Sequence, residues 1–109
     1  MSLRRGDVVI VSLPGDYGKP RPAVVIQSDA LSGFDSVILC PLTTAQTDTP
    51  LIRLTLEPNA ENGLTARSEV MTEKVSTVSR RRTGRPIGRL SAAELAALDA
   101  KLVMVLGLV

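Results

Sequence analysis

The feature that most constrains this chain is the shortness of its apolar runs. Segments of strand length, rich in Val, Ile and Leu, are separated by stretches that contain Pro, Gly, Asn or Asp, residues that favour turns. The pattern predicts five or six short strands rather than alternating strands and helices, so the expected fold class is mainly β. The expected strands cover residues 8–12, 23–27, 36–42, 52–56, 68–74 and 87–90.

The polarity pattern of these segments predicts where each strand lies. Residues 23–27 and 36–42 are almost continuously apolar, which predicts central strands buried on both faces. Residues 52–56 alternate strictly between apolar and polar side chains, which predicts a strand with one face in water. We expect these strands to form a small, strongly bent barrel, a single domain over residues 1–109.

One helix is expected at the C-terminal end. Ser91 and Glu94 match a capping box, in which the serine hydroxyl and the glutamate carboxylate accept hydrogen bonds from backbone amides of the first turn. Gly107 is suited to end the helix in a left-handed conformation. Between these residues, one apolar helix face is predicted from Leu95, Leu98, Leu102 and Val105.

Composition narrows the possible functions. Of the 109 residues 44% are hydrophobic, yet Tyr17 and Phe34 are the only aromatic ones. This scarcity argues against a protein that binds RNA mainly by stacking bases on aromatic rings. The single cysteine, Cys40, excludes an internal disulfide and cannot form a zinc site alone. Its apolar neighbours predict a small buried hydrophobic residue.

The chain contains no histidine. Ribonuclease chemistry by paired histidines is therefore excluded, and so is any His-ligated metal centre. The acidic residues form no local pattern of spaced carboxylates, so we expect neither a metal site nor a cofactor. The N-terminal segment has no apolar stretch long enough for a signal peptide or a membrane span, which favours a cytoplasmic protein without a membrane partner.

The positive charge is unevenly distributed. The net charge is only +2, but five arginines fall within residues 80–89, which contain no acid. Such a run is either a solvated surface or a stripe of phosphate contacts, and composition leaves both readings open. Arginine supplies ten of the thirteen basic residues, and its planar guanidinium fits phosphate better than a lysine ammonium does. The five are Arg80, Arg81, Arg82, Arg85 and Arg89.

Several short motifs follow one another along the whole chain. They are RGDVV at 5–9, RPAVVIQSD at 21–29, PLTT at 41–44, NGL at 62–64, SEV at 68–70, EKVSTV at 73–78, IGRLS at 87–91 and LGL at 106–108. In this order and spacing the chain resembles the MazF/PemK family of toxins from type II toxin–antitoxin systems. By this resemblance, residues 68–78 form the fifth strand and the turn that follows it.

The resemblance implies both fold and activity. The fold is a small SH3-like, CcdB-type β-barrel of five to six strands with a C-terminal α-helix. The activity is that of a sequence-specific, metal-independent endoribonuclease, which cuts single-stranded RNA, mRNA in particular, by attack of a 2′-hydroxyl on the adjacent phosphate. The family also forms two-fold homodimers that build the RNA groove across their interface, and a small cognate antitoxin protein blocks that groove.

By the same resemblance, Arg21 and Thr43 form the catalytic pair. Arg21 can donate two hydrogen bonds to the scissile phosphate and stabilise the charge of the transition state. Because arginine stays protonated in proteins, we assign proton transfer to water or substrate groups. Thr43 can orient a phosphate oxygen, and Thr44 stays an alternative because successive strand residues point to opposite faces. The structural alternative for Arg21 is an arginine that caps a strand edge. For Thr43 it is a strand residue favoured for its β-branched side chain.

Glu73 matches an acidic position of the family and completes the expected catalytic set. It could orient Arg21 or accept the 2′ proton. Alternatively, it is a surface acid paired with Lys74 or Arg67. Seven further residues are candidates for contacts with RNA phosphates or bases: Lys19, Thr44, Gln46, Arg67, Arg80, Arg81 and Arg82.

The first loop departs from the family pattern. Many members have a longer loop with a glutamate and a glutamine before the RP dipeptide, whereas this loop spans only residues 14–20, with Asp16 and Lys19 as its charged residues. Because the loop shapes the RNA groove in the family, the preferred cleavage sequence does not carry over. Whether Asp16 replaces the missing glutamate stays open.

Two other functions compete with RNA cleavage. A CcdB-like gyrase poison would have the same fold, but CcdB-type chains end in Trp-Gly-Ile, and this chain ends in Gly-Leu-Val without any Trp. A non-catalytic barrel would use the arginine run to bind RNA or protein without cleavage. Residues 102–109 are apolar on more than one helix face, which indicates a surface for a partner.

Overall fold

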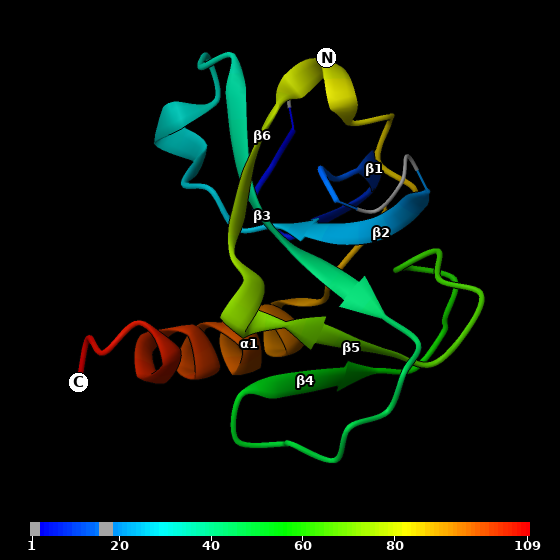
Figure 1. Ribbon diagram of the computed structural model, residues 1–109, viewed down its shortest axis with the longest axis vertical. Coiled ribbons are helices and arrows are strands. Elements are labelled where there is room, and N and C mark those ends of the chain that lie inside the picture. Colours follow the sequence, from blue (N-terminus) through cyan, green and yellow to red (C-terminus); the bar gives the residue numbers. More distant parts are fainter. Residues whose placement is uncertain (1–2, 16–18) are drawn as a thin grey trace.

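The computed structural model describes residues 3–15 and 19–109, which form seven strands, three short 3-10 turns and one α-helix (Figure 1). The strands are β1 (Asp7–Ser12), β2 (Pro20–Val25), β3 (Ser36–Thr43), β4 (Arg53–Leu56), β5 (Ser68–Met71), β6 (Ser76–Ser79) and β7 (Gly88–Arg89). The 3-10 turns are η1 (Asp29–Leu31), η2 (Thr72–Lys74) and η3 (Arg80–Arg82), and the helix is α1 (Ala92–Val105).

The centre of the sheet is β3, which pairs antiparallel with three other strands. Residues 39–41 pair with β2, residues 42–43 with β5 and residues 36–39 with β6. On the β2 side, β1 and then β7 extend the sheet, and on the β5 side β4 completes it. Because β5 and β6 pair with different halves of β3, the sheet curls into a half-barrel with α1 across one end (Figure 1). The mainly β fold with a C-terminal helix is confirmed.

The strand β6 corrects one expectation. The sequence predicts a single strand over residues 68–74 followed by a turn, whereas β5 ends at Met71, η2 follows, and residues 76–79 form an additional strand. Val78 is the one buried residue of β6, and a four-residue segment with one inward side chain has no readable alternation. The described residues therefore hold seven strands rather than five or six.

Two prolines lie inside a strand that begins earlier than expected. The sequence predicts a strand from residue 23, but β2 starts at Pro20, and Pro22 lies opposite Ile10 of β1. The Ile10 carbonyl points away from β2 and accepts from the Gly84 amide. Ile10 and Pro22 are therefore a pair that exchanges no backbone hydrogen bonds. The paired residues of β2 and β3 begin only at Ala23. Prolines are tolerated here because no ladder needs their missing N–H group.

The alternation of side chains divides the core into two clusters. On one face of β2 and β3, Val24 and Cys40 pack with residues of β5 and with Leu98 of α1; on the other, Ala23 and Leu39 pack with residues of β1 and β6. The predicted burial of these two strands on both faces is confirmed. Burial raises the pKa of Cys40 to about 12, so its thiol is an unreactive part of the core.

The helix has the ends that the sequence predicts. The Ser91 hydroxyl accepts from the Glu94 amide at 3.1 Å, and the Glu94 carboxylate accepts from the Ser91 amide at 2.8 Å. Gly107 follows with a φ of 71°, and the Leu108 amide donates to the Val103 carbonyl at 2.8 Å. These contacts satisfy backbone groups that every helix terminus leaves open. In the described part of the chain, no helix has the length and apolarity to cross a membrane.

The N-terminal RGD segment has a structural role. The Arg5 guanidinium forms an ion pair with Asp99 of α1, with nitrogen–oxygen distances of 2.6 and 3.2 Å. Asp7 accepts from the Arg89 guanidinium at 2.7 Å. Gly6 between them has a φ of 93°, which favours glycine. The segment therefore fixes both the helix and β7 to the edge of the sheet.

The loop before β5 is organised around Asn62, which is completely buried. Its amide nitrogen donates to the Glu57 carbonyl at 2.8 Å, and its side-chain oxygen accepts from the amides of Asn59 at 3.1 Å and Leu64 at 3.0 Å. This side chain thus satisfies three backbone groups of a loop that has no strand to pair with.

We predict that Asn62→Ala destabilises the protein by about 2–4 kcal/mol, because buried backbone groups lose their partners and each costs about 1–3 kcal/mol. Chemical denaturation of both proteins measures this difference. Thr65→Ala, at an exposed neighbouring position, is the control and should change stability by less than about 0.5 kcal/mol. Equal stabilities of Asn62→Ala and the parent protein would contradict the assigned role.

Candidate active site

Arg21 and Thr43 lie on the same face of neighbouring strands. Ala23 pairs with Pro41, and continuing this antiparallel register by two residues sets Arg21 opposite Thr43. Because side chains alternate along a strand, Arg21 shares the face of Ala23, and Thr43 shares the face of Pro41. The Nη1 atom of Arg21 donates to the Leu42 carbonyl at 3.5 Å, which holds the guanidinium near the end of β3.

The two candidate threonines have different positions. Thr43 is the last residue of β3 and is half-buried, whereas Thr44 is exposed beyond the strand. The Thr43 hydroxyl oxygen accepts from the Ala45 amide at 3.2 Å, which leaves its hydrogen able to donate. Thr43 is therefore the threonine on the Arg21 face.

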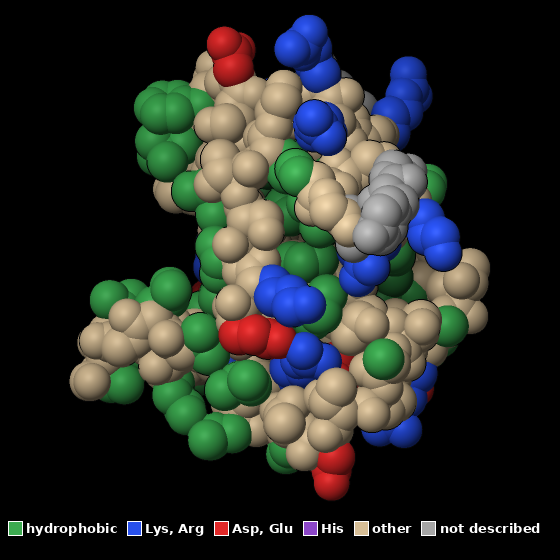
Figure 2. Space-filling view, viewed as in Figure 1, with side chains coloured by type: hydrophobic (Ala, Val, Ile, Leu, Met, Phe, Trp, Pro, Cys, Tyr) green, Lys and Arg blue, Asp and Glu red, His purple; other side chains and the backbone are tan. Residues whose placement is uncertain are grey.

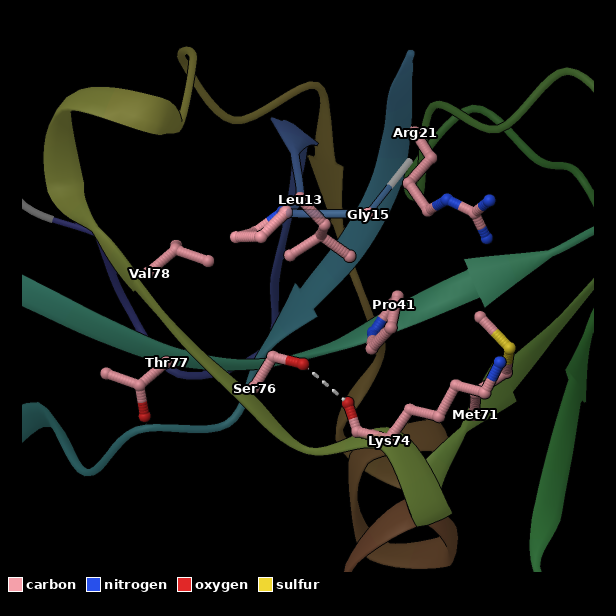
Figure 3. A pocket seen from close by; sticks show the side chains of 10 residues that line it. Leu13, Gly15, Arg21, Pro41, Met71, Lys74, Ser76, Thr77 and Val78 are labelled. Atoms are coloured by element: carbon pink, nitrogen blue, oxygen red, sulfur yellow. Dashed lines mark hydrogen bonds between the residues drawn. The ribbon is translucent and has the colours of Figure 1, made fainter. Parts of the chain in front are cut away.

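An open cavity of about 520 Å³ lies beside Arg21 (Figure 3). In Figure 3, the Arg21 side chain projects from β2 on the side of the cavity where Met71 and Lys74 also lie. From the sequence, Lys74 is expected only as a possible partner for Glu73, whereas the fold places it in the wall of the cavity. The lining residues are Leu13, Pro14, Gly15, Arg21, Pro41, Met71, Lys74, Ser76, Thr77 and Val78.

Glu73 is bound by Arg53, which no sequence pattern marks as a site residue. Its carboxylate accepts from Nε and Nη2 of Arg53 at 3.3 and 2.5 Å, and not from Lys74 or Arg67 as the surface alternative supposed. Arg53 is the first residue of β4, in which apolar and polar side chains alternate. From the sequence it therefore cannot be distinguished from a residue on the solvated face of the strand. These hydrogen bonds from Arg53 lower the pKa of Glu73.

The same guanidinium contacts a second, buried carboxylate. Nη1 of Arg53 lies 3.2 Å from Glu69 and 3.2 Å from the hydroxyl oxygen of Thr47. Glu69 also accepts from the Thr47 hydroxyl at 2.9 Å and from the Thr47 amide at 3.1 Å. Burial raises the pKa of Glu69, but the hydrogen bonds from Thr47 and Arg53 outweigh it, and the pKa is lowered.

Almost the whole sequence matches one known protein family. The family of PemK-like, MazF-like toxins of type II toxin–antitoxin systems matches residues 4–106. The chain belongs to this family.

Individual relatives agree with this assignment. The chain is 39% identical over 107 residues to a "Probable endoribonuclease MazF" of Mycolicibacterium smegmatis, covering 97% of this chain and 98% of that protein. It is 31% identical over 116 residues to "Endoribonuclease MazF9" of Mycobacterium tuberculosis, with the same coverage. A solved mycobacterial "endoribonuclease in complex with its cognate antitoxin" has the same fold, with a TM-score of 0.83 at 21% identity over 98% of this chain and 97% of that one.

The other residues that the sequence suggests for RNA contact lie at the surface of the protein. Lys19 is exposed immediately before β2. The Gln46 amide donates to the Thr44 carbonyl at 3.1 Å and to the Arg67 carbonyl at 3.4 Å. Arg67 pairs with Glu57 at 3.2 Å, and both side chains are mostly exposed. Gln46 and Arg67 also line a smaller hollow of about 190 Å³. Asp16 lies outside the described residues.

The arginine run does not act as one uniform stripe. Arg80 donates to the carbonyls of Phe34 and Ser32 at 3.0 and 2.9 Å, and Arg89 is paired within the fold, as described above. Arg81, Arg82 and Arg85 are exposed. Figure 2 shows basic side chains gathered at this end of the molecule, over η3 at the top of the view. Three of the five arginines are thus exposed on the surface.

Two further observations describe the surface. Among residues 3–15 and 19–109, no group of three or more His, Cys, Asp or Glu side chains is placed to hold a metal ion.

At the C-terminal end, apolar side chains are exposed, and Figure 2 shows them at the lower left of the molecule. They are Met104, Leu106, Leu108 and Val109.

We predict that the Arg53 network makes stability depend on acidic pH. Because the folded-state pKa values of Glu69 and Glu73 are lowered, the network stabilises the fold above about pH 4.3, the ordinary value for glutamate, and this contribution is lost as pH falls through the lower folded-state values. Thermal unfolding between pH 7 and pH 3 measures it. Arg53→Gln should have a lower Tm than the parent protein at pH 7 and lose less of its Tm on acidification.

Arg67→Gln is the matched control for that measurement. The ion pair of Arg67 with Glu57 is exposed, and exposed pairs contribute little to stability. Arg67→Gln should therefore have the Tm and the pH dependence of the parent protein. If Arg53→Gln behaves in the same way, the network does not contribute as described.

Proposed function

We propose that this protein is the endoribonuclease toxin of a toxin–antitoxin pair. It cleaves single-stranded RNA, with Arg21 and Thr43 as its catalytic residues. One observation carries the proposal: these two residues, far apart in sequence, lie on one face of β2 and β3, and Arg21 lines an open cavity there. Family membership and the endoribonuclease names of two relatives support the same activity.

The reaction proposed is an internal transesterification. The 2′-oxygen of a ribose forms a bond to the adjacent phosphorus and loses its proton, while the bond from phosphorus to the 5′-oxygen breaks and the leaving oxygen takes up a proton. The products are a 2′,3′-cyclic phosphate and a free 5′-hydroxyl. This route needs stabilisation of a phosphorane that carries extra negative charge, together with two proton transfers.

Arg21 supplies the charge stabilisation. Its guanidinium can donate two parallel hydrogen bonds to the non-bridging phosphate oxygens, and it is partly buried, where charge interactions are stronger than in water. The Thr43 hydroxyl donates to the same phosphate and fixes its orientation. The two protons pass through water or substrate groups, because arginine does not release its own.

In the proposed mechanism, Glu73 acts through its neighbours and does not contact the reacting atoms. A carboxylate that accepts two hydrogen bonds from Arg53 has a lowered pKa and is a weak proton acceptor. The lowered pKa argues against Glu73 as the group that takes the 2′ proton. The catalytic set that we propose is therefore Arg21 and Thr43, with Glu73 in a supporting role.

The exposed cations around the site bind the RNA backbone. Phosphate contacts of this kind supply affinity and orientation without reading sequence. Arg81 and Arg82 are exposed and suit this role best, whereas Arg80 contributes charge from a side chain that already holds two carbonyls. The further candidates are Lys19, Thr44, Gln46, Arg67 and Lys74.

Two protein partners complete the proposal. The first is a cognate antitoxin, supported by the mycobacterial complex of the same fold. The second is another copy of this chain, which would cover the exposed apolar side chains of Met104, Leu106 and Leu108. Sedimentation of the parent protein and of Met104→Lys at micromolar concentration tests the dimer. The protein acts in the cytoplasm, where its mRNA substrate is.

We predict that the purified protein cleaves RNA equally well with and without excess EDTA. The mechanism places charge stabilisation on a guanidinium, and no step uses a metal ion. Incubation with a defined RNA, followed by analysis of the fragment ends, should find 2′,3′-cyclic phosphates or the 3′-phosphates that form when the ring opens. Loss of cleavage on chelation and its return with Mg²⁺ would refute this mechanism. A protein that binds RNA but leaves it intact, or that traps gyrase instead, would refute the function itself.

We predict that Arg21→Ala lowers the cleavage rate about 10²–10³-fold, which corresponds to about 3–4 kcal/mol of transition-state stabilisation. RNA affinity should fall much less, because Arg81 and Arg82 remain. Arg21→Lys should recover little, since an ammonium cannot reproduce the two-pronged contact. Cleavage of an oligonucleotide, fluorescence anisotropy and thermal unfolding measure these effects.

Arg4→Ala provides the matched control, because Arg4 is an exposed arginine outside the site. It should cleave at the parent rate. Near-normal cleavage by a folded Arg21→Ala protein would place the active site elsewhere.

A further inference from the structure

One guanidinium joins three segments that are distant in sequence. Arg53 of β4 contacts Thr47 in the loop after β3, Glu69 in β5 and Glu73 in η2, at nitrogen–oxygen distances between 2.5 and 3.3 Å. Its side chain is only 12% exposed, and that of Glu69 only 5%. Guanidinium groups suit such a junction because their five donors lie in one rigid plane.

The first of these segments follows Thr43 directly. Thr43 lies opposite Glu69 in the β3–β5 ladder. The side chain of Glu69 then accepts both the amide and the hydroxyl of Thr47, four residues further along the chain, and Arg53 contacts the same hydroxyl. The chain leaving Thr43 is therefore held on one side by the ladder and on the other by charged hydrogen bonds.

The second segment is η2, which forms part of the cavity wall. Glu73 lies within this turn, and Met71 and Lys74 beside it line the cavity together with Arg21. The Thr72 hydroxyl donates to the Ile52 carbonyl, one residue before Arg53. Two contacts from the start of β4 thus hold the turn that presents Lys74.

We propose that Arg53 is a positioning residue for RNA cleavage: through Glu69 and Thr47 it fixes the Thr43 end of β3, and through Glu73 it fixes the η2 wall of the Arg21 cavity. This inference rests on the endoribonuclease function proposed above. The required alignment of Arg21, Thr43 and phosphate is strict, since a displacement of about 1 Å can reduce a rate about 10²-fold. Buried ion pairs add little net stability relative to apolar side chains of the same volume. We therefore assign the Arg53 ion pairs a role in the geometry of the site.

The test compares Arg53→Gln, Glu73→Gln and the double variant as full-length proteins. A defined RNA oligonucleotide is the substrate, and the assay temperature lies below the Tm of the parent protein, of Glu73→Gln and of the control variant. If the pair acts as one unit, each single variant should lower kcat about 10–100-fold, and the double variant should be no slower than the slower single variant. KM should change less than about threefold, because the phosphate contacts proposed for Arg81 and Arg82 are untouched. Arg53→Lys should retain part of kcat, since it keeps the charge and loses the fork.

Asp99→Asn is the matched control. It breaks an ion pair of similar length between Arg5 and α1, away from the cavity, so it should lower Tm and leave kcat unchanged. This control separates a loss of stability from a loss of alignment. If Arg53→Gln unfolds below the assay temperature, Glu73→Gln decides the question alone, because its side chain is 31% exposed and tolerates the change better.

The pH profile distinguishes positioning from proton transfer. If Glu73 is the general base, Arg53→Gln should move the acidic limb of the kcat profile to higher pH, since Glu73 loses the contacts that lower its pKa, and kcat should recover above that limb. If Arg53 positions the site, kcat should be reduced by the same factor across the whole profile.

The outcomes that overturn the inference are distinct from failure of the proposed function. A folded Arg53→Gln protein within about twofold of the parent kcat, additive losses in the double variant, or recovery at high pH would each overturn it. A parent protein that leaves every RNA intact would instead overturn the endoribonuclease proposal, and with it the basis of this one.

Discussion

The pairing of β3 with three strands is the constraint on which the rest of the structure depends. Its backbone pairs with β2, β5 and β6, and its side chains contribute to both core clusters. A strand of this kind must be apolar on both faces, which explains the nearly continuous run from Val37 to Leu42. Because its two ends have different partners on one side, the sheet bends there, while the antiparallel register with β2 on the other side brings the end of β3 next to Arg21.

Charged side chains then fix the elements that the sheet leaves open. Arg5 holds α1 through Asp99, Arg89 holds the N-terminal turn through Asp7, and Arg53 holds η2 through Glu73. Each pair joins residues that are 20 or more positions apart in sequence. The arginines of this chain therefore fall into two groups: some guanidinium groups are paired within the fold, and others are exposed on the surface, where we propose that they bind RNA phosphates.

The proposed chemistry follows from this division. Without histidine, acid–base catalysis at neutral pH has no obvious side chain, and charge stabilisation by a guanidinium is the mechanism that the residues can support. Such a mechanism depends on geometry more than on pKa, because the group that acts does not titrate. A small domain can meet that demand when the strands bearing Arg21 and Thr43 are fixed by neighbouring ion pairs.

Local patterns in the sequence determined the fold class, the central strands, the capped helix that Gly107 follows, the burial of Cys40 and the exclusion of histidine chemistry. Each depends on periodicity or composition within a few residues. The sequence did not reveal β6, the bonding of Glu73 to Arg53 or the place of Lys74 in the cavity wall, and it could not divide the arginine run into paired and exposed members. Those features depend on strand register and on contacts between residues far apart in the chain, which only the tertiary structure decides, because a shift of one residue along a strand turns every side chain to the opposite face.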